Sequence, residues 1–304
     1  MGTFQSFWYG KSLPQYQQLA LKSFVDHGHV FHLYTYDELE APAGVEIRDA
    51  QMILPRDRIF FYKRGEGLGN VAGFSDLFRF RLLHERGGWW VDTDVICLSD
   101  QIPEPDIYLG WQDHRLVGSA IMRLPKGSAL TQELLQDAER AGTDIDFGEI
   151  GPGLITRVAK EQGLSDRLLP QTEIYPIAPF EALNVLLPSK TEEVRRKAGS
   201  APFLHLWNEM FGRAAILGWV APPLDCYIRE LFSRHEIPIS DRYCYSAGEM
   251  ERININLLRS MGAETQFRRA RKLEKEAAEL RRKLAEAESI LAALHSGVVF
   301  TGGG

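Results

Sequence analysis

The chain has 304 residues, of which 44% are hydrophobic and 25% are charged, and its formal net charge is −6. These proportions are ordinary for a globular protein, and the length suffices for one large or two small domains with a substantial core. The acidic balance argues against a general nucleic-acid binder, because such proteins normally carry a basic excess.

Targeting and redox signals are weak. The N-terminal residues show no charged region followed by an apolar one, so no signal peptide is expected. The longest apolar run, near 214–224, contains Gly218 and two prolines and is too short to span a bilayer. Cys97, Cys226 and Cys244 lack zinc-site spacing and are expected to be reduced thiols. We therefore expect a cytoplasmic protein, with peripheral association at the inner membrane as an alternative.

Strands and helices alternate along the first half of the chain, as judged from apolar periodicity and from glycine and proline. The segment 38–69 is expected to be irregular. Ser75 is expected to cap a helix that continues to Arg86, with Asp76 in its first turn and the glycine pair at 87–88 ending it. The expected strands are 4–9, 30–36, 89–98, 107–111 and 117–124, and the expected helices are 13–27, 75–86, 128–141 and 153–162. This alternation predicts an α/β sheet domain.

The last part of the chain changes character. Between Gln266 and His295 there is no proline or glycine, and apolar residues recur at spacings of three and four, which is a heptad pattern. The heptad positions are Ala270, Leu273, Ala277, Leu280, Leu284, Ala287, Leu291 and Leu294. Two readings remain open: a coiled coil that joins copies of the chain or docks a partner, and a long amphipathic helix packed on its own domain. The expected organisation is a domain at 1–260, this helix or coiled coil at 265–295, and a frayed tail at 296–304.

Two carboxylates, Asp92 and Asp94, lie within the β-prone run after the glycine pair. On a strand they would project from one face, with Thr93 on the other. Two such carboxylates repel each other unless a cation lies between them, and a divalent metal that also holds a diphosphate would satisfy both. The alternative is a pair of turn aspartates that cap backbone groups at a strand end.

Asp76 and Arg79 lie one helical turn apart. They could form an exposed ion pair worth only a few tenths of a kcal/mol. Their neighbours are almost all apolar, however, so the helix is expected to be buried on several sides. A buried aspartate and arginine need partners, which favours a role in ligand binding.

Four further segments are candidates for the site. Trp8 ends the first predicted strand, where ligands of α/β sheets bind, and could stack on a base or be a core residue. Asn70 follows a glycine and could approach a nucleotide or simply form a turn. The glycine-rich turn at 149–153 could face an acceptor or merely begin a helix. His205 and Trp207 would share a strand face, and His205 could be a metal ligand or an ordinary core histidine.

These motifs together resemble those of the DXD glycosyltransferases of the GT-A fold. The groups to which the chain is most similar are the Och1-like mannosyltransferases, the sugar-binding DXD family of bacterial polysaccharide enzymes, and the large clostridial toxin glucosyltransferase domains. The resemblance covers residues 1–235 and is carried by Phe7-Trp8-Tyr9-Gly10, by 69–79, by Asp92-Thr93-Asp94 and by 205–208. Lys11 stands where the family often has a second glycine.

The resemblance implies a GT-A-type, Rossmann-like mixed sheet flanked by helices, and a hexosyltransferase that uses Mn²⁺ or Mg²⁺. It implies that Asp94 ligates the metal directly, that Asp92 lies nearer the nucleotide, and that a late histidine lies near the metal. The expected catalytic residues are Asp76, Arg79, Asp92 and Asp94; the expected nucleotide-sugar-binding residues are Trp8, Asn70, Asp76, Arg79, Asp92 and Trp207; the expected metal ligands are Asp92, Asp94 and His205.

The function so implied is transfer of a sugar from a UDP- or GDP-sugar to an acceptor hydroxyl, with retention of configuration, in bacterial polysaccharide or glycan assembly. The acceptor could be a glycan, a lipid-linked glycan or a protein. The alternatives are a protein-modifying effector and a non-catalytic GT-A-like module that binds nucleotide-sugars. A glycoside hydrolase is disfavoured, because its two carboxylates must flank the scissile bond rather than share a strand face about 6.5–7 Å apart. No nucleic-acid partner is expected.

Overall fold

The structure, a computed structural model of the whole chain, describes residues 1–65, 67–199 and 201–295; within the last helix it does not describe the side chains of 267–275, 277–278, 284 and 289–295. The chain forms two compact units, Met1–Glu251 and Arg252–Gly304. The predicted frayed tail at 296–304 lies outside the described residues, and the predicted domain boundaries remain predictions.

The first unit contains strands β1 (Thr3–Trp8), β2 (Val30–Thr35), β3 (Val45–Asp49), β4 (Gly88–Val91), β5 (Val95–Cys97), β6 (Ile121–Leu124) and β7 (Phe203–His205). Its α-helices are α1 (Gln15–Asp26), α2 (Ala72–Arg86), α3 (Ala129–Ala141), α4 (Leu154–Glu161), α5 (Gln171–Ile174), α6 (Thr191–Ala198), α7 (Asn208–Arg213) and α8 (Tyr227–Arg234). The main sheet has the order β3-β2-β1-β4-β6, and β5 and β7 form a separate antiparallel pair.

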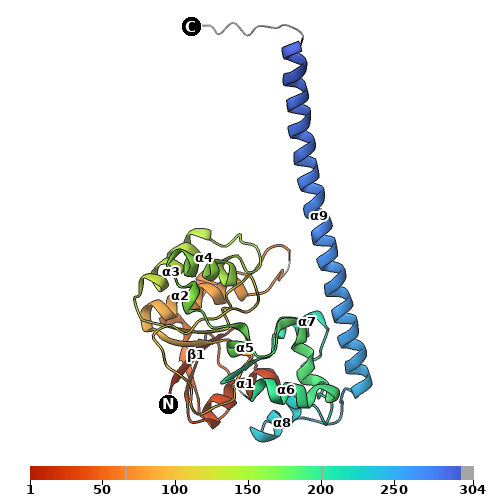
Figure 1. Cartoon of the computed structure of the whole chain (residues 1–304). Helices are drawn as coiled ribbons and strands as arrows, with labels where there is room; N and C mark the ends of the chain where they lie inside the picture. The colour runs from red at the N-terminus through yellow and green to blue at the C-terminus, as the bar shows by residue number, and fades with distance from the viewer. Residues whose placement is uncertain (66, 200, 296–304) are drawn as a thin grey trace. The chain divides into compact units, whose positions relative to one another are not determined.

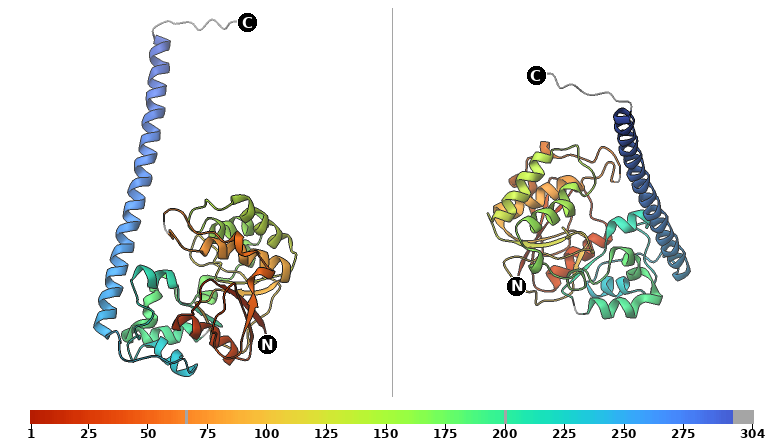
Figure 2. Two further views of the ribbon diagram at one scale, coloured as in Figure 1. Left: turned by 180° about the vertical axis from the view of Figure 1, so that it is seen from behind. Right: turned by 45° about the horizontal axis from the view of Figure 1, so that its top comes forward.

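The main sheet is mixed. Strands β3, β2, β1 and β4 are parallel, whereas β6 runs antiparallel to β4. Figure 1 shows α2, α3 and α4 on one side of this sheet and α1 on the other, and the reverse view in Figure 2 agrees. The predicted α/β fold with a mixed sheet flanked by helices is therefore confirmed. Because the parallel strands all end at one edge, that edge is where a ligand site is expected.

Strand β1 packs against helices on both of its faces. Phe7 stacks on Phe78 of α2 with ring centroids 4.6 Å apart, and Phe4 lies 4.7 Å from Phe24 of α1. Residues three apart on a strand point to opposite faces, so both faces of β1 are buried. A strand covered on both sides needs consecutive apolar residues rather than alternating ones, which explains the aromatic-rich start of the chain.

Strand β4 repeats this arrangement with two adjacent tryptophans. Trp89 stacks on Phe4 at 5.2 Å, whereas Trp90 lies 6.5 Å from Phe78 on the opposite face. Both indoles are almost completely buried. Each buried aromatic side chain stabilises the fold by roughly 1.5–3 kcal/mol through removal of apolar surface from water. The pair fixes β4 between β1 and β6 in the sheet, directly before Asp92.

Three details of the secondary structure differ from the prediction. The segment expected to be irregular contains β3, a short and largely exposed edge strand. Ser75 does not cap α2, because the helix begins at Ala72, and the side-chain oxygen of Asn70 accepts a hydrogen bond from the Ala72 N–H at 2.8 Å. The strand expected at 107–111 pairs only through isolated bridges at Tyr108, Gly110 and Trp111.

Helix α9 (Ala247–His295) begins in the first unit and makes up the described part of the second. Its 49 residues form one helix, and at 1.5 Å per residue it is about 70 Å long. A helical C-terminal appendage is thus present, and the helix starts well before the predicted position. Among the described residues, none of the helices combines the length and the apolarity needed to cross a membrane.

Gly87 and Gly142 give a matched test of backbone packing. Both follow the end of a helix with positive φ, 68° and 73° respectively. A Cβ at Gly87 would lie 2.5 Å from the backbone nitrogen of Lys126, whereas a Cβ at Gly142 would meet nothing within 4 Å. Gly142→Ala should therefore lower the free energy of unfolding by about 1–3 kcal/mol through backbone strain alone. Gly87→Ala should cost about 1–3 kcal/mol more because of the clash. Urea denaturation measures both, and equal losses would contradict the prediction.

Candidate metal centre

Asp92 and Asp94 lie in the turn that joins β4 to β5. Strand β4 ends at Val91, β5 begins at Val95, and the Val95 N–H donates to the carbonyl oxygen of Asp92 at 3.1 Å. The expectation that the two aspartates alternate along one continuous strand is therefore wrong. A four-residue turn brings the carboxylates together instead, because it folds the chain back between two strands that belong to different sheets.

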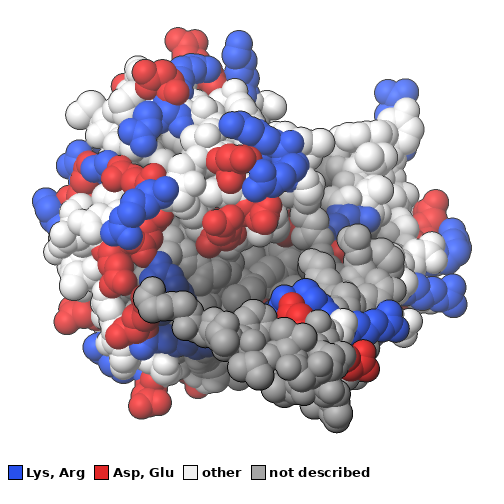
Figure 3. Space-filling view, turned by 90° about the horizontal axis from the view of Figure 1, so that it is seen from above, with Lys and Arg blue, Asp and Glu red and all other residues white. Residues whose placement is uncertain are grey.

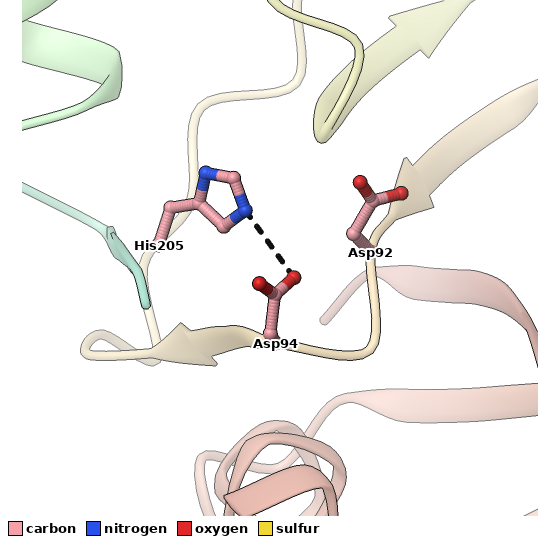
Figure 4. A group of neighbouring side chains, drawn as sticks. All are labelled: Asp92, Asp94 and His205. Carbon is pink, nitrogen blue, oxygen red and sulfur yellow. Dashed lines mark ion pairs between the residues drawn. The ribbon is translucent and has the colours of Figure 1, made fainter. Parts of the chain in front are cut away.

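His205 reaches the same place from β7. In the antiparallel pair of β5 and β7, His205 is opposite Val95, and the Leu206 N–H donates to the carbonyl oxygen of Asp94 at 3.0 Å. One ligand atom from each of Asp92, Asp94 and His205 lies within 4.8 Å of the other two. In Figure 4 the imidazole and both carboxylates face a common space, and His205 Nε2 lies 3.2 Å from Asp94 Oδ1. The structure thus brings together the three predicted metal ligands.

Asp94 is set up as an ionised carboxylate. Its burial alone would raise the pKa of this carboxyl, but the facing His205 and the Asn208 N–H oppose that effect, and the pKa of Asp94 lies below its ordinary value. The Asn208 N–H donates to Asp94 Oδ2 at 2.9 Å and begins helix α7. The carboxylate therefore also caps this helix, as the alternative interpretation of the aspartates had suggested.

The surroundings of Asp92 shift the pKa of its carboxyl in the opposite direction. Burial raises the pKa of this carboxyl above its ordinary value; Arg79 opposes the rise and the neighbouring Asp94 adds to it. Asp92 Oδ1 accepts a hydrogen bond from Trp90 Nε1 at 2.8 Å and lies 3.0 Å from Arg79 Nη2. Among the described residues, Oδ2 is left without a hydrogen bond, so it is the oxygen available to a ligand.

Arg79 is enclosed by protein groups, with 4% of its surface exposed. Besides Asp92, its guanidinium donates from Nη1 to the Ser119 carbonyl at 2.6 Å, lies 4.8 Å from the centre of the Trp90 ring, and places Nε 3.4 Å from Asp76 Oδ1. The simple surface ion pair is therefore excluded. In this arrangement Arg79 holds Asp92 and Asp76 in place, and helix α2 is bound to the β4–β5 turn through it.

Asp76 is also buried. Burial raises the pKa of Asp76 to about 6, with Arg79 opposing the rise and Asp92 adding to it. The turn Glu149–Gly153 lies directly against Asp76, because a Cβ on Gly151 would be 2.6 Å from Asp76 Oδ2. Only a residue without a side chain allows this approach. The glycine-rich turn singled out in the sequence thus belongs to the surroundings of Asp76.

Trp207 packs against His205. Its backbone is left-handed, with φ at 56°, which costs a residue other than glycine of the order of 1–3 kcal/mol. Its ring centroid lies 4.1 Å from that of His205 and 5.3 Å from that of Tyr175, and its Nε1 donates to the Ile177 carbonyl at 2.8 Å. The strained residue orients the imidazole and places the next N–H, that of Asn208, on Asp94.

The remaining two predicted residues lie at the edge of this arrangement. Trp8 ends β1, which is parallel to β4, so both strands reach the same edge of the sheet. Its side chain is half-buried, and Nε1 donates to the Ser12 carbonyl at 3.1 Å. Asn70 is exposed, and its oxygen is used in capping α2. For both residues a role in nucleotide binding remains a prediction.

Sequence reasoning missed the supporting groups. Trp90, the carbonyl of Ser119, the backbone N–H of Asn208 and Tyr175 all contact or orient the predicted residues. Trp90 could have been found, because it lies two residues before Asp92. The others are brought in by tertiary contacts between segments far apart in the chain, for which the sequence carries no local signal.

One protein-family model matches part of the chain. A family model described as "Capsular polysaccharide synthesis protein" matches residues 57–109, a segment that contains Asp76, Arg79, Asp92 and Asp94. No curated protein matches the chain. The family match agrees with the role in polysaccharide synthesis that the resemblance implies.

Two solved structures show partial likeness. One, "PaToxG Glycosyltransferase", has a TM-score of 0.42 and 12% identity over 55% of this chain and 71% of its own. The other, a transferase with two cysteines changed to serine, has a TM-score of 0.36 and 11% identity over 54% of this chain and 85% of its own. At these TM-scores the structural likeness adds no argument of its own.

Arg79 and Arg81 on the same helix separate a buried ion pair from an exposed one. Arg79→Met should lower the free energy of unfolding by about 3–5 kcal/mol, because it leaves the buried Asp76 and the half-buried Asp92 without their cation. Arg81 pairs with Glu139 at the surface, and Arg81→Met should cost at most about 1 kcal/mol. Adding Asp76→Asn to the Arg79→Met variant should restore part of the loss. Chemical denaturation measures all three, and equal losses at the two arginines would refute the assignment.

Proposed function

We propose that the chain is a metal-dependent glycosyltransferase that moves a sugar from a nucleotide-sugar to an acceptor hydroxyl. The observation that carries this proposal is the convergence of Asp92, Asp94 and His205 within 4.8 Å, beside the buried pair of Asp76 and Arg79. The site lies where parallel strands of the sheet end, which is the position of ligands in open α/β sheets. The matched family of capsular polysaccharide synthesis proteins supports a glycan product.

The donor set fits a divalent cation. Two carboxylates and one imidazole suit Mn²⁺, whereas Mg²⁺ prefers oxygen ligands alone. His205 Nε2 is the nitrogen turned toward Asp94, so it is the ligand nitrogen. Three protein ligands leave coordination positions open for diphosphate oxygens. Bound there, the cation would neutralise the charge that develops on the leaving nucleoside diphosphate.

The protein's own residues position the donor and the ligands. Arg79 and Trp90 hold Oδ1 of Asp92, so that Oδ2 faces the site. Trp207 orients His205 from behind. Asp76, which is buried beside Arg79 and lies against Gly151, is the proposed partner of a sugar hydroxyl. Arg79 would contribute chiefly through Asp92 and Asp76, because its guanidinium is already bound on several sides.

The finer points of the proposal rest on the resemblance. These are retention of configuration, a UDP- or GDP-sugar as donor, stacking of the base on Trp8, and contacts from Asn70 and Trp207 to the nucleotide-sugar. A glycan or lipid-linked glycan is the proposed acceptor, and a protein acceptor is the alternative. On the face drawn in Figure 3, the acidic and basic side chains of the described residues are interspersed.

Metal titration tests the proposal directly. Wild-type protein should bind Mn²⁺ and hydrolyse or transfer from at least one nucleotide-sugar of a UDP- and GDP-sugar panel. Asp94→Asn should weaken Mn²⁺ binding by more than about 100-fold, because substitution of groups that only support metal ligands already costs 10–100-fold. Asp113→Asn is the matched control, since within the described part of the chain Asp113 accepts hydrogen bonds from the Arg115 and Leu116 N–H groups and is not among the residues that could hold a metal. Calorimetry and donor hydrolysis measure both effects.

The outcomes separate the alternatives. Unchanged Mn²⁺ affinity in the Asp94→Asn variant would remove the metal site. Binding of Mn²⁺ and nucleotide-sugar without hydrolysis or transfer to any acceptor would favour the non-catalytic binding module. Transfer to a protein but not to glycans would favour the protein-modifying enzyme.

We also propose that α9 joins two copies of the chain in a parallel coiled coil. Leu280, a heptad core position, is 65% exposed. In parallel register, Glu276 would face Arg281 of the second copy and Lys283 would face Glu288, so both pairs at the flanking positions are of opposite charge. Of the other heptad positions only Ala287 has a described side chain, and it is exposed.

Light scattering on the full chain tests self-association. Wild type should have the mass of a dimer, and Leu280→Lys should have the mass of a monomer, because a charge at a core position is buried without a partner. Arg282→Ala changes a position outside the seam and should leave the dimer intact. A monomeric wild type would refute self-association and favour docking of a different partner.

A further inference from the structure

An exposed apolar cluster follows the metal centre along the chain. At its centre are Trp219 (62% exposed) and Tyr243 (53%), and Leu217 (45%) and Leu224 (65%) are exposed on the same segment as Trp219; we call these four residues the apolar patch. The rings of Trp219 and Tyr243 are perpendicular, with centroids 5.6 Å apart, so the two segments form one surface. No role in the proposed reaction uses these residues.

The backbone holds the patch in this exposed position. The Ala221 N–H donates to the Tyr243 carbonyl, and the Tyr245 N–H donates to the Ala221 carbonyl, both at 2.9 Å. The Tyr245 hydroxyl accepts from the Leu217 N–H at 3.0 Å. The apolar side chains are thus presented by two mutually bonded segments, and their exposure is a built feature of the surface.

Leaving these groups in water is unfavourable. A single exposed leucine is common in folded proteins, but a contiguous group of large apolar side chains usually marks an interaction surface. The mixture of residue types indicates what this interaction surface binds. Aromatic rings alone would suit a sugar, whereas leucine beside tryptophan and tyrosine is typical of segments that insert at the boundary between lipid headgroups and acyl chains.

The charge beside the patch completes the argument. The Arg242 guanidinium lies 5.4 Å from the centre of the Tyr243 ring and has no ion pair with any residue that the structure describes. The neighbouring Asp241 is paired with Arg229, so it does not neutralise Arg242. An unpaired cation at the rim of an apolar surface attracts anionic headgroups.

We propose that the apolar patch docks the protein on an anionic lipid surface, with Leu217, Trp219, Leu224 and Tyr243 inserted and Arg242 at the headgroups. The proposal does not depend on the proposed reaction. Docking would nevertheless affect the proposed reaction, because α7 connects the patch to the metal centre. This helix has only six residues and begins at Asn208, whose backbone N–H donates to Asp94. Docking would therefore hold the site near an acceptor at the membrane surface.

Vesicle co-sedimentation of the full-length chain tests the proposal, with vesicles of phosphatidylcholine alone or mixed with phosphatidylglycerol. Wild type should sediment with the mixed vesicles. Trp219→Ala should lower the partition coefficient about tenfold or more, as expected from loss of one inserted aromatic side chain. Arg242→Glu should abolish the preference for phosphatidylglycerol. Phe180→Ala is the matched control, because Phe180 is 58% exposed but lies outside the patch.

Circular dichroism and thermal unfolding confirm that the variants are folded before binding is compared. Equal binding of Trp219→Ala and Phe180→Ala would overturn the proposal, and would also be the result if α9 alone carried membrane binding. Failure of the wild type to sediment with either vesicle would overturn it as well. So would retention of vesicle binding by Trp219→Ala together with loss of binding to a soluble polysaccharide such as dextran, which would identify the patch as a sugar-binding surface.

Discussion

The buried guanidinium of Arg79 is the interaction on which the site depends. It bonds to Asp92 in the β4–β5 turn and to the Ser119 carbonyl, and it faces Asp76 one helical turn away. A buried charge without partners is strongly destabilising, so α2, the turn and the segment before β6 must keep their relative positions. The same contacts select which oxygen of Asp92 faces the site. Fold and site are therefore constrained by one ion-pair network, and neither can change without the other.

The second half of the site comes from a different sheet. Asp94 precedes β5 and His205 ends β7, so the two residues meet only because these strands pair antiparallel. Trp207 then adopts a left-handed backbone that turns the chain into α7 and stacks on His205. The strain of that conformation is maintained by the half-buried indole, which packs on His205 and donates to the Ile177 carbonyl. Strain of this kind in a non-glycine residue is found where surrounding contacts over-determine a functional geometry.

The sequence predicted those parts of the structure that depend on local patterns. The strands around Phe4 and Val30 and the burial of Asp76 and Arg79 follow from consecutive apolar residues, and the structure agrees. Strand β3 was not predicted because its alternation is only five residues long, with two apolar residues, Val45 and Ile47, each followed by a charged residue. The start of α2 was predicted three residues too late, because Asn70, and not Ser75, provides the side-chain oxygen that accepts a hydrogen bond at the beginning of the helix. The turn at Asp92 and the strain at Trp207 depend on pairing between β5 and β7, which no local pattern encodes.

The balance of charge among the side chains of the site limits what can bind there. Asp76 and Asp92 contact the guanidinium of Arg79, and Asp94 lies beside Asp92 and His205. Three ionised carboxylates around one arginine would leave the cluster with an excess of negative charge. The structure relieves this excess in part by raising the pKa of Asp76 and Asp92, while Asp94 keeps its charge through His205 and the Asn208 N–H. A divalent cation would cancel the excess and lower the pKa of both raised carboxyls. A diphosphate ligand would then meet a less anionic cluster. The same balance would lower the repulsion between an anionic ligand and this site in a chain whose net charge is −6.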